Sequence, residues 1–267
     1  MRVAVCQMHS GEDVEANLVE AERLLNEAAG GGADLAALPE VFPFVGPQSR
    51  AAELAEPLDG DIVKRLASVA RERSMWVLGG SVYESDEGRV YNTSPLFNRS
   101  GEIVARYRKI HLFDVELPNE SFRESDLFSA GDQIVTGETE FGRVGLTICY
   151  DLRFPELYRG LMAVGAEVLF VPAHFRELTG EAHWDVLLRA RAIEDQCFVV
   201  APAQWGPFGE GLRSFGHSLV VDPWGRVLVD AGGEGSGVWI ADLDLSELRK
   251  VRERLPALQH RRLGLTS

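Results

Sequence analysis

The sequence predicts an α/β fold in which mixed sheets are covered by helices on their outer faces. Segments with apolar residues at helical spacing alternate along the chain with short apolar runs typical of buried strands. Several neighbouring runs are joined by short turns, which indicates antiparallel hairpins and argues against a purely parallel sheet. A pair of mixed sheets with helices outside satisfies both observations.

The first half of the chain supplies five predicted strands and two predicted helices. The apolar run that ends in glycines at its C-terminus predicts a helix over 13–32, and a second helical pattern covers 61–74. Strands are predicted over 2–7, 33–40, 75–84, 89–98 and 102–109, the last two joined by a tight turn. Residues 110–134 carry no regular pattern and are predicted to be mostly loop.

The second half continues the alternation. Strands are predicted over 142–148, 166–173, 197–204 and 237–243, and helices over 155–165, 183–196 and 246–255. Residues 215–231 predict a hairpin with its turn at "DPWG". With no repeat and no linker, we expect one domain over 1–267, with its core in about 1–245 and a C-terminal helix and tail in 246–267.

The composition is that of an ordinary globular protein. The chain has 267 residues, of which 45% are hydrophobic and 25% charged, and its formal net charge is −14. This charge argues against a partner that is nucleic acid or an anionic membrane surface. It leaves room for a local basic pocket that binds a small acid.

Three scattered cysteines, Cys6, Cys149 and Cys197, do not suit a disulfide framework or a zinc site. We therefore expect a reducing cytoplasm, with Cys6 and Cys197 in the core. The six histidines lack the spacing of a metal motif, so neither a metal nor a cofactor is predicted. No stretch approaches the roughly 20 apolar residues of a membrane span.

Three reactive side chains lie at the ends of predicted strands: Glu40, Lys109 and Cys149. Strand ends at one edge of a sheet lie close in space, and active sites of α/β proteins gather there. A carboxylate, an ammonium and a thiol at one edge would suit acyl transfer, as base, oxyanion stabiliser and nucleophile. Taken singly, each also has an ordinary explanation: a loop carboxylate, a solvated lysine and a buried inert thiol.

The motifs "LPE", "YRKIHLFD" and "CYDLRFPELYR", in this order, resemble the signatures of the nitrilase superfamily, the carbon–nitrogen hydrolases. The resemblance implies a four-layer α-β-β-α sandwich. It also implies that Glu40 is the general base, Lys109 stabilises the oxyanion and Cys149 is the nucleophile, with the backbone N–H of Tyr150 as a second oxyanion donor.

The segment "FRESDLFSAGD" resembles the part of the family that supplies a second glutamate. This residue maps to Glu124, which we favour over its neighbour Glu120. The segments "TGEAHWDVLLRARAIEDQCFVVAPAQ", "FGHSLVVDPWG" and "LPALQHRR" are similar to the amidase branch that includes deaminated glutathione amidase and ω-amidase. The similarity implies hydrolysis of a primary amide of a small carboxylic acid through an acyl-thioester, with release of ammonia.

The acid end of such a substrate needs cationic or donor groups. Arg176, Thr179 and His183, in a predicted loop after a strand, are candidates, although Arg176 and His183 could equally be surface groups. We expect Arg153 to hold a buried carboxylate, either Asp151 or Glu156.

Several alternatives stay open at this point. An N-carbamoyl amidohydrolase or a nitrilase would use the same triad. A papain-like protease with His111, His174 or His217 would leave Glu40 and Lys109 without roles. A catalytically inactive binding or scaffold subunit represents another class. The partners expected are a small-molecule amide and a second copy of the chain, with the basic segment 252–267 reaching across a homodimer interface.

Overall fold

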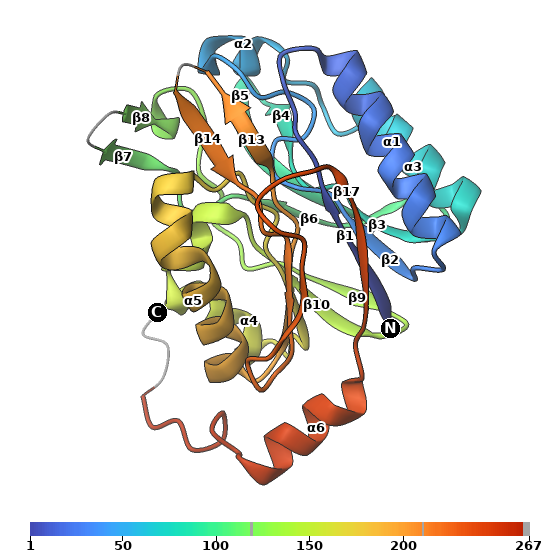
Figure 1. Ribbon diagram of the computed structural model, residues 1–267, viewed down its shortest axis with the longest axis vertical. Coiled ribbons are helices and arrows are strands. Elements are labelled where there is room, and N and C mark those ends of the chain that lie inside the picture. Colours follow the sequence, from blue (N-terminus) through green and yellow to red (C-terminus); the bar gives the residue numbers. More distant parts are fainter. Residues whose placement is uncertain (118–119, 210, 264–267) are drawn as a thin grey trace.

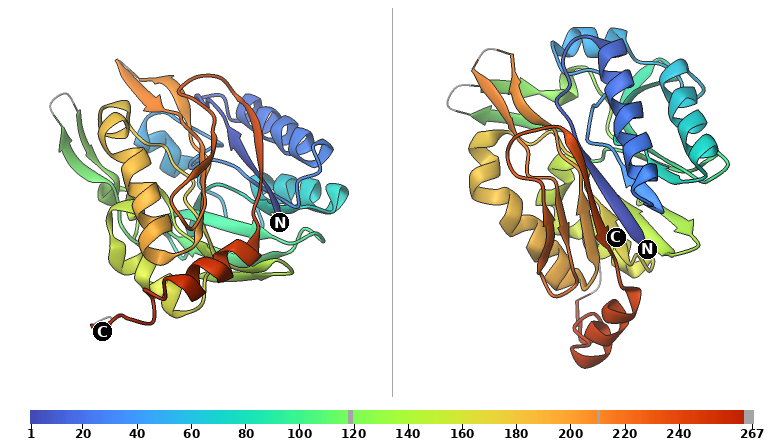
Figure 2. Two further views of the ribbon diagram at one scale, coloured as in Figure 1. Left: turned by 60° about the horizontal axis from the view of Figure 1, so that its bottom comes forward. Right: turned by 45° about the vertical axis from the view of Figure 1, so that its right-hand side comes forward.

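Two sheets lie face to face in the computed structural model, which describes residues 1–117, 120–209 and 211–263 (Figure 1). Helices cover the outer face of each sheet, so the layers run helix, sheet, sheet, helix (Figure 2). This order confirms the α-β-β-α sandwich that the family resemblance implied.

The first sheet contains seven strands and is mixed. Its members are β1 (Arg2–Gln7), β2 (Leu35–Ala37), β3 (Trp76–Leu78), β4 (Val82–Asp86), β5 (Arg89–Phe97), β6 (Ile103–Arg108) and β17 (Gly237–Asp242). They lie in the order β17-β1-β2-β3-β5-β4, and β6 pairs with β5. β1 is parallel to β2 and antiparallel to β17.

The second sheet contains six strands in the order β16-β15-β12-β11-β10-β9. These are β9 (Thr136–Thr139), β10 (Gly142–Leu146), β11 (Val168–Phe170), β12 (Phe198–Ala201), β15 (Leu219–Val221) and β16 (Val227–Asp230). The central strands β10, β11 and β12 are parallel, and the outer pairs are antiparallel.

Six α-helices and two short 3₁₀ turns complete the described residues. They are α1 (Val14–Gly30), α2 (Gln48–Glu53), α3 (Asp61–Arg73), α4 (Pro155–Ala163), α5 (Glu177–Asp195), α6 (Leu245–Arg254), η1 (Glu124–Asp126) and η2 (Cys149–Arg153). α1 and α3 cover the first sheet, and α4 and α5 cover the second (Figure 1). No helix in these ranges has the length and apolarity needed to cross a membrane.

The strands between the two layers of helices are buried on both faces. In β1, Val3 and Val5 face the second sheet, while Ala4 and Cys6 pack under α1 and α3. This alternation follows from the two-residue period of a strand. Cys6 and Cys197 are buried and unpaired, as predicted for core cysteines.

Several regions differ from the sequence-based prediction, among them α2 and β9, which were not predicted. The predicted loop 110–134 contains the hairpin β7 (Asp114–Leu117) and β8 (Glu120–Arg123) as well as η1. A second hairpin, β13 (Trp205–Phe208) and β14 (Leu212–Phe215), was not predicted. Both hairpins project beyond the sheets at the same end of the molecule (Figure 1).

Another difference is the start of α5, which was predicted at residue 183 but begins at Glu177. Thr179 and Gly180 are weak helix formers and concealed this turn in the sequence. Packing stabilises it instead, because a Cβ on Gly180 would lie 2.3 Å from the Phe215 ring of β14.

The predicted strand 75–84 is also divided, because the chain turns at Gly79 and Gly80 between β3 and β4. α6 lies beneath the second sheet (Figure 1) and is attached there by Arg252, whose Nε donates to the Gln196 carbonyl at 2.9 Å. Of the predicted tail, residues 264–267 lie outside the described part of the chain.

Candidate active site

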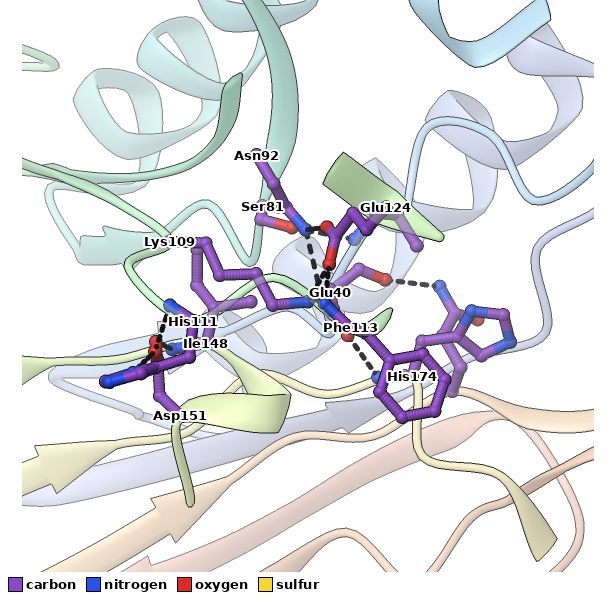
Figure 3. Close-up of polar contacts among 12 residues, drawn as sticks. Glu40, Ser81, Asn92, Lys109, His111, Phe113, Glu124, Ile148, Asp151 and His174 are labelled. Carbon is purple, nitrogen blue, oxygen red and sulfur yellow. Dashed lines mark hydrogen bonds and ion pairs between the residues drawn. The ribbon is translucent and has the colours of Figure 1, made fainter. Parts of the chain in front are cut away.

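The ends of strands from both sheets bring the candidate catalytic side chains together. Glu40 follows β2, Lys109 follows β6, and Cys149 opens η2 after β10. Figure 3 shows Glu40 and Lys109 pointing toward each other and toward Glu124 of η1, and Cys149 lines the same cavity as these side chains. The prediction that the three strand ends would meet therefore agrees with the structure.

Lys109 lies between two carboxylates. Its Nζ is 2.9 Å from Oε1 of Glu40 and 2.9 Å from Oε2 of Glu124, and all three side chains are buried. The same Oε2 of Glu124 also accepts the backbone N–H of Phe113 at 2.7 Å. The structure thus brings Glu124 to Lys109, while Glu120 begins strand β8.

Burial opposes a positive charge on Lys109, but the carboxylates of Glu124 and Glu40 outweigh that effect. Together they raise the pKa of Lys109 well above its usual value, so the ammonium stays charged. A fixed positive charge at a buried position can stabilise an anion that forms beside it.

Cys149 occupies the sharp bend between β10 and α4. Its backbone has φ 44°, a left-handed conformation that is rare for residues other than glycine. Its N–H donates to the Pro172 carbonyl at 3.0 Å, which fixes the bend to the end of β11. Tyr150 follows in the first turn of η2, where an N–H has no partner within the helix.

The Cys149 thiol is protonated at rest. Burial raises its pKa well above the usual value, and the charge of Glu40 and a hydrogen bond to its carboxylate raise it further. The positive charge of Lys109 acts in the opposite direction. A thiol in this setting needs a neighbouring base before it can act as a nucleophile.

The backbone around Glu40 is held as firmly as that around Cys149. The N–H of His174 donates to Oε2 of Glu40 at 2.8 Å. The next residue, Val41, has φ 47°, and Oγ of Ser81 accepts its N–H at 2.9 Å. Gly80 is required here, because a Cβ would lie 2.0 Å from the Pro39 carbonyl oxygen.

A cavity of about 760 Å³ opens onto these groups. Glu40, Lys109, Glu124 and Cys149 all contribute to its wall. This volume falls within the range of pockets that bind small molecules. Two carboxylates, an ammonium and a thiol at the wall of such a cavity can carry out acyl transfer.

Comparisons with known proteins agree with this chemistry. A family model for carbon–nitrogen hydrolases matches residues 2–253. The chain belongs to the carbon–nitrogen hydrolase family. It is therefore an enzyme, a hydrolase that cleaves the carbon–nitrogen bond of an amide.

Individual relatives support the same assignment. A Bos taurus protein described as deaminated glutathione amidase is 45% identical over 271 residues, which cover 98% of this chain and 82% of the relative. The structure of the C. elegans NitFhit protein has a TM-score of 0.92 at 37% identity, over 99% of this chain and 66% of that longer one. Saccharomyces cerevisiae Nit3, a member of branch 10 of the nitrilase superfamily, has a TM-score of 0.89 at 30% identity, over 98% of this chain and 97% of that one.

The cavity of this carbon–nitrogen hydrolase has an aromatic wall around Arg176. The guanidinium lies 4.3 Å from the ring centre of Phe208 in β13 and 5.3 Å from that of Phe122 in β8. Arg176 therefore contacts both projecting hairpins. Burial, and then the charge of Arg176, hold the pKa of the neighbouring His174 well below its usual value, so that ring is neutral.

The remaining substrate-binding candidates are divided between the cavity and its surroundings. Thr179 lines the cavity, but from α5 and not from the predicted loop, with its Oγ1 donating to the Arg176 carbonyl at 3.3 Å. His183 also belongs to α5, and it is not among the described residues of the cavity wall. Its Nδ1 lies 3.3 Å from Nη1 of Arg153.

The expectation for Arg153 is wrong. Arg153 lines the cavity, with its guanidinium 5.2 Å from the ring centre of Phe175 and 5.7 Å from that of Tyr150. Within the described ranges it has no carboxylate partner. Asp151 is bound instead by Tyr107, His111 and the backbone of Ile148.

One residue of the hydrolase site was missed by sequence reasoning. Asn92 is buried, and its Nδ2 donates to Oε1 of Glu40 at 3.0 Å and to Oε1 of Glu124 at 3.2 Å. Asn92 therefore joins the same two carboxylates as Lys109, and both residues donate to Oε1 of Glu40 (Figure 3). The sequence feature that could have indicated Asn92 is the polar run "NTS" within the predicted strand 89–98.

No cluster of three or more potential metal ligands occurs among the described residues.

Proposed function

We propose that this hydrolase cleaves the amide bond of deaminated glutathione, with Cys149 as nucleophile, Glu40 as acid and base, and Lys109 as oxyanion stabiliser. One observation carries the catalytic part: a buried ammonium lies 2.9 Å from each of two carboxylates, beside a buried thiol at a cavity wall. The substrate follows from the relatives of this name and from the cationic groups in the cavity.

In the first step, the Glu40 carboxylate takes the proton of the Cys149 thiol as the sulfur attacks the amide carbonyl. The high pKa of the thiol makes this base necessary, because little thiolate exists at rest. The His174 N–H and Asn92 hold the Glu40 carboxylate from two sides, so it needs no reorientation.

The tetrahedral intermediate carries a negative charge on the former carbonyl oxygen. Lys109 and the backbone N–H of Tyr150 are the donors we assign to this oxyanion. Donors of this kind typically contribute about 3–4 kcal/mol to transition-state stabilisation. Glu124 holds Lys109 in place and balances its charge, without contacting the reacting atoms.

Collapse of the intermediate breaks the carbon–nitrogen bond. Glu40 returns its proton to the leaving nitrogen, and an acyl-thioester remains on Cys149. Water then attacks the thioester, again with Glu40 as base, and the carboxylic acid and the free thiol are released. Glu40 therefore acts as acid and base in turn.

The proposed substrate is anionic and bulky. Glutathione is γ-glutamyl-cysteinyl-glycine, so its deaminated form carries two carboxylates joined through amides. Arg153 and Arg176 place positive charge in the cavity of a chain whose net charge is −14. Arg153 supports the proposal most directly, because it lies four residues beyond the nucleophile with its charge unbalanced by any described carboxylate.

The identity of the released amine distinguishes deaminated glutathione from a primary amide as the substrate. Attack at the deaminated glutamyl carbonyl would release cysteinylglycine, whereas the primary amide expected from the sequence would release ammonia. We would assay both products from deaminated glutathione, α-ketoglutaramate, an N-carbamoyl amino acid and an aliphatic nitrile, with Cys149→Ala as the blank. Cysteinylglycine release that is lost in Cys149→Ala supports the proposal.

Two outcomes would contradict the substrate assignment: turnover of α-ketoglutaramate alone, or of the carbamoyl compound or nitrile alone. Activity retained in Cys149→Ala would instead refute the nucleophile.

We also propose a cytoplasmic homodimer. The described cysteines are all unpaired thiols, which suits a reducing compartment. α5 buries one face against the second sheet, yet its opposite face carries Leu178, Ala182, Val186 and Ile193 in exposed positions. A helix that is apolar on both faces is typically covered on both. A second copy of the chain is the partner we propose, with the segment 246–267 at or near the interface.

A further inference from the structure

Asp151 is a fully buried carboxylate to which the proposed mechanism assigns no role. It is 0% exposed, and no lysine or arginine of the described residues balances its charge. Such a group is costly to bury unless hydrogen bonds compensate for the lost hydration. Its presence two residues after Cys149 therefore calls for an explanation.

Four donors surround the carboxylate. Oδ2 accepts the Tyr107 hydroxyl at 2.8 Å and the Ile148 backbone N–H at 2.8 Å. Oδ1 accepts the backbone N–H of His111 at 3.1 Å and contacts Nδ1 of the same residue at 2.7 Å. Figure 3 shows the His111 and Ile148 contacts, next to Lys109.

These donors come from the segments that carry two of the proposed catalytic groups. Tyr107 and His111 lie two residues before and two residues after Lys109, at the end of β6 in the first sheet. Ile148 directly precedes Cys149, at the end of β10 in the second sheet. One carboxylate therefore connects both sides of Lys109 to the backbone that leads into the nucleophile.

The partners of Asp151 are themselves held rigidly. The His111 ring stacks on Phe154 with its centre 3.7 Å away and the planes 5° apart, which directs Nδ1 at the carboxylate. Burial, and then the charge of Asp151, raise the pKa of Tyr107 well above its usual value, so the hydroxyl remains a donor. Asp151 also donates its own N–H to the Ile148 carbonyl at 3.0 Å, which closes the bend around Cys149.

We propose that Asp151 is a positioning residue that fixes the Lys109 ammonium relative to the Cys149 sulfur across the two sheets. The inference rests on the proposed function, in which these two groups act on one carbonyl. A displacement of about 1 Å between reacting groups can cost on the order of 100-fold in rate. Such a displacement is expected to change turnover far more than substrate binding.

The test is Asp151→Asn, whose amide cannot accept all four hydrogen bonds. We expect kcat per titrated active site to fall about 30- to 100-fold, with KM changed less than 3-fold. Asp195→Asn is the matched control, because Asp195 is an equally buried carboxylate at the far end of α5. If Asp151 only stabilises the fold, both variants will keep wild-type kcat per titrated site.

A second readout does not depend on the amide substrate. Lys109 lowers the pKa of the Cys149 thiol, so its displacement should shift the pH profile of Cys149 alkylation by iodoacetamide toward higher pH. We expect this shift in Asp151→Asn and not in Asp195→Asn. If wild-type protein hydrolyses none of the amides, the proposed function fails while the alkylation profile still decides the role of Asp151.

If Asp151→Asn does not fold, Tyr107→Phe tests the positioning role of Asp151 instead. This substitution removes one donor and leaves the carboxylate in place. We expect a 3- to 10-fold loss in kcat, or a shift of the Cys149 alkylation profile toward higher pH that is smaller than the shift in Asp151→Asn. Wild-type kcat together with a wild-type alkylation profile, in whichever of the two variants folds, would overturn the proposal.

Discussion

Left-handed backbone conformations occur at one proposed catalytic residue and directly after another. Cys149 has φ 44° and Val41, directly after Glu40, has φ 47°. Conformations of this kind cost roughly 1–3 kcal/mol each and persist only where neighbouring contacts enforce them. Ser81, Gly80, Pro172 and Asp151 supply those contacts. A cysteine or valine gives no sequence signal for such a bend, whereas a glycine would.

Residue types nevertheless predicted much of the site. Glu40, Lys109 and Cys149 were found from their positions after strands, and motif context selected Glu124. Arg153 could not be assigned correctly, because Asp151 and Glu156 are near it in sequence and only the fold decides the partner. Asn92 was missed because a polar residue inside a strand can also face solvent.

Glu124→Gln tests whether the second glutamate maintains the charge balance of the site. Without the Glu124 charge, Lys109 is attracted to Glu40 alone, which weakens that carboxylate as a base. We expect steady-state assays to give a kcat reduced about 100-fold, with KM within 3-fold of wild type. Asp126→Asn is the control, since Asp126 is exposed in the same short helix. Equal activities of the two variants would remove Glu124 from the mechanism.

Arg153→Met tests the binding of the substrate carboxylate. A hydrogen bond to a charged group contributes about 1.5–3 kcal/mol, so we expect KM for deaminated glutathione to rise about 10- to 100-fold with little change in kcat. A neutral amide substrate should show no such rise. Arg189→Met, on the exposed face of α5, should behave like wild type. Parallel changes in KM for anionic and neutral amides would count against Arg153.

Secondary-structure elements with strong periodicity were predicted well, and those that depend on packing were not. α1 and α3 differ from prediction only at their ends. The hairpins β7–β8 and β13–β14 lack the apolar alternation of core strands, because they project from the sandwich. The first turn of α5 depends on contact between Gly180 and Phe215, two residues remote in sequence.

Asp195, at the C-terminal end of α5, makes the free energy of unfolding depend on pH. Asp195 closes the helix, and its burial raises the pKa of the carboxyl from 3.8 to about 7, although the charge of Arg159 opposes this shift. Between these pH values the unfolded chain has lost the proton that the folded chain still holds. The contribution of Asp195 to stability is therefore greatest at acidic pH and is lost as the pH rises through 7.

Asp195→Asn removes this titration. We expect the Tm of the variant relative to wild type to increase from pH 5 to about pH 7 and then to level off up to pH 8, measured by circular dichroism in matched buffers. Each unit of pKa difference corresponds to about 1.4 kcal/mol. Asp185→Asn, an exposed position on the same helix, should give a Tm difference that does not change with pH. A Tm difference that is constant or decreasing with pH in Asp195→Asn would contradict the assignment.

At the scale of the whole molecule, the alternation of helices and strands predicted the layers but not what lies on their outer surfaces. The relation between the sheets is set by cross-sheet contacts such as those of Asp151, which no local pattern encodes. The exposed apolar stripe on α5 was equally hidden, because the same helix also buries Trp184 and Leu188. Sequence periodicity alone cannot distinguish a helix covered on one face from one covered on two.

The stripe makes the homodimer testable. Trp224 is also exposed, and its neighbour Gly225 lies against Ile193, so the turn after β15 extends the same apolar surface. Light scattering at micromolar concentration should give about twice the 29.4 kDa of one chain. Replacing both Val186 and Ile193 with glutamate should yield a folded monomer, since two buried charges oppose the contact. Val19→Glu, equally exposed on α1 in the opposite layer, should remain dimeric. A wild-type mass of one chain, or a dimer that survives the double substitution, would place the interface elsewhere or remove it.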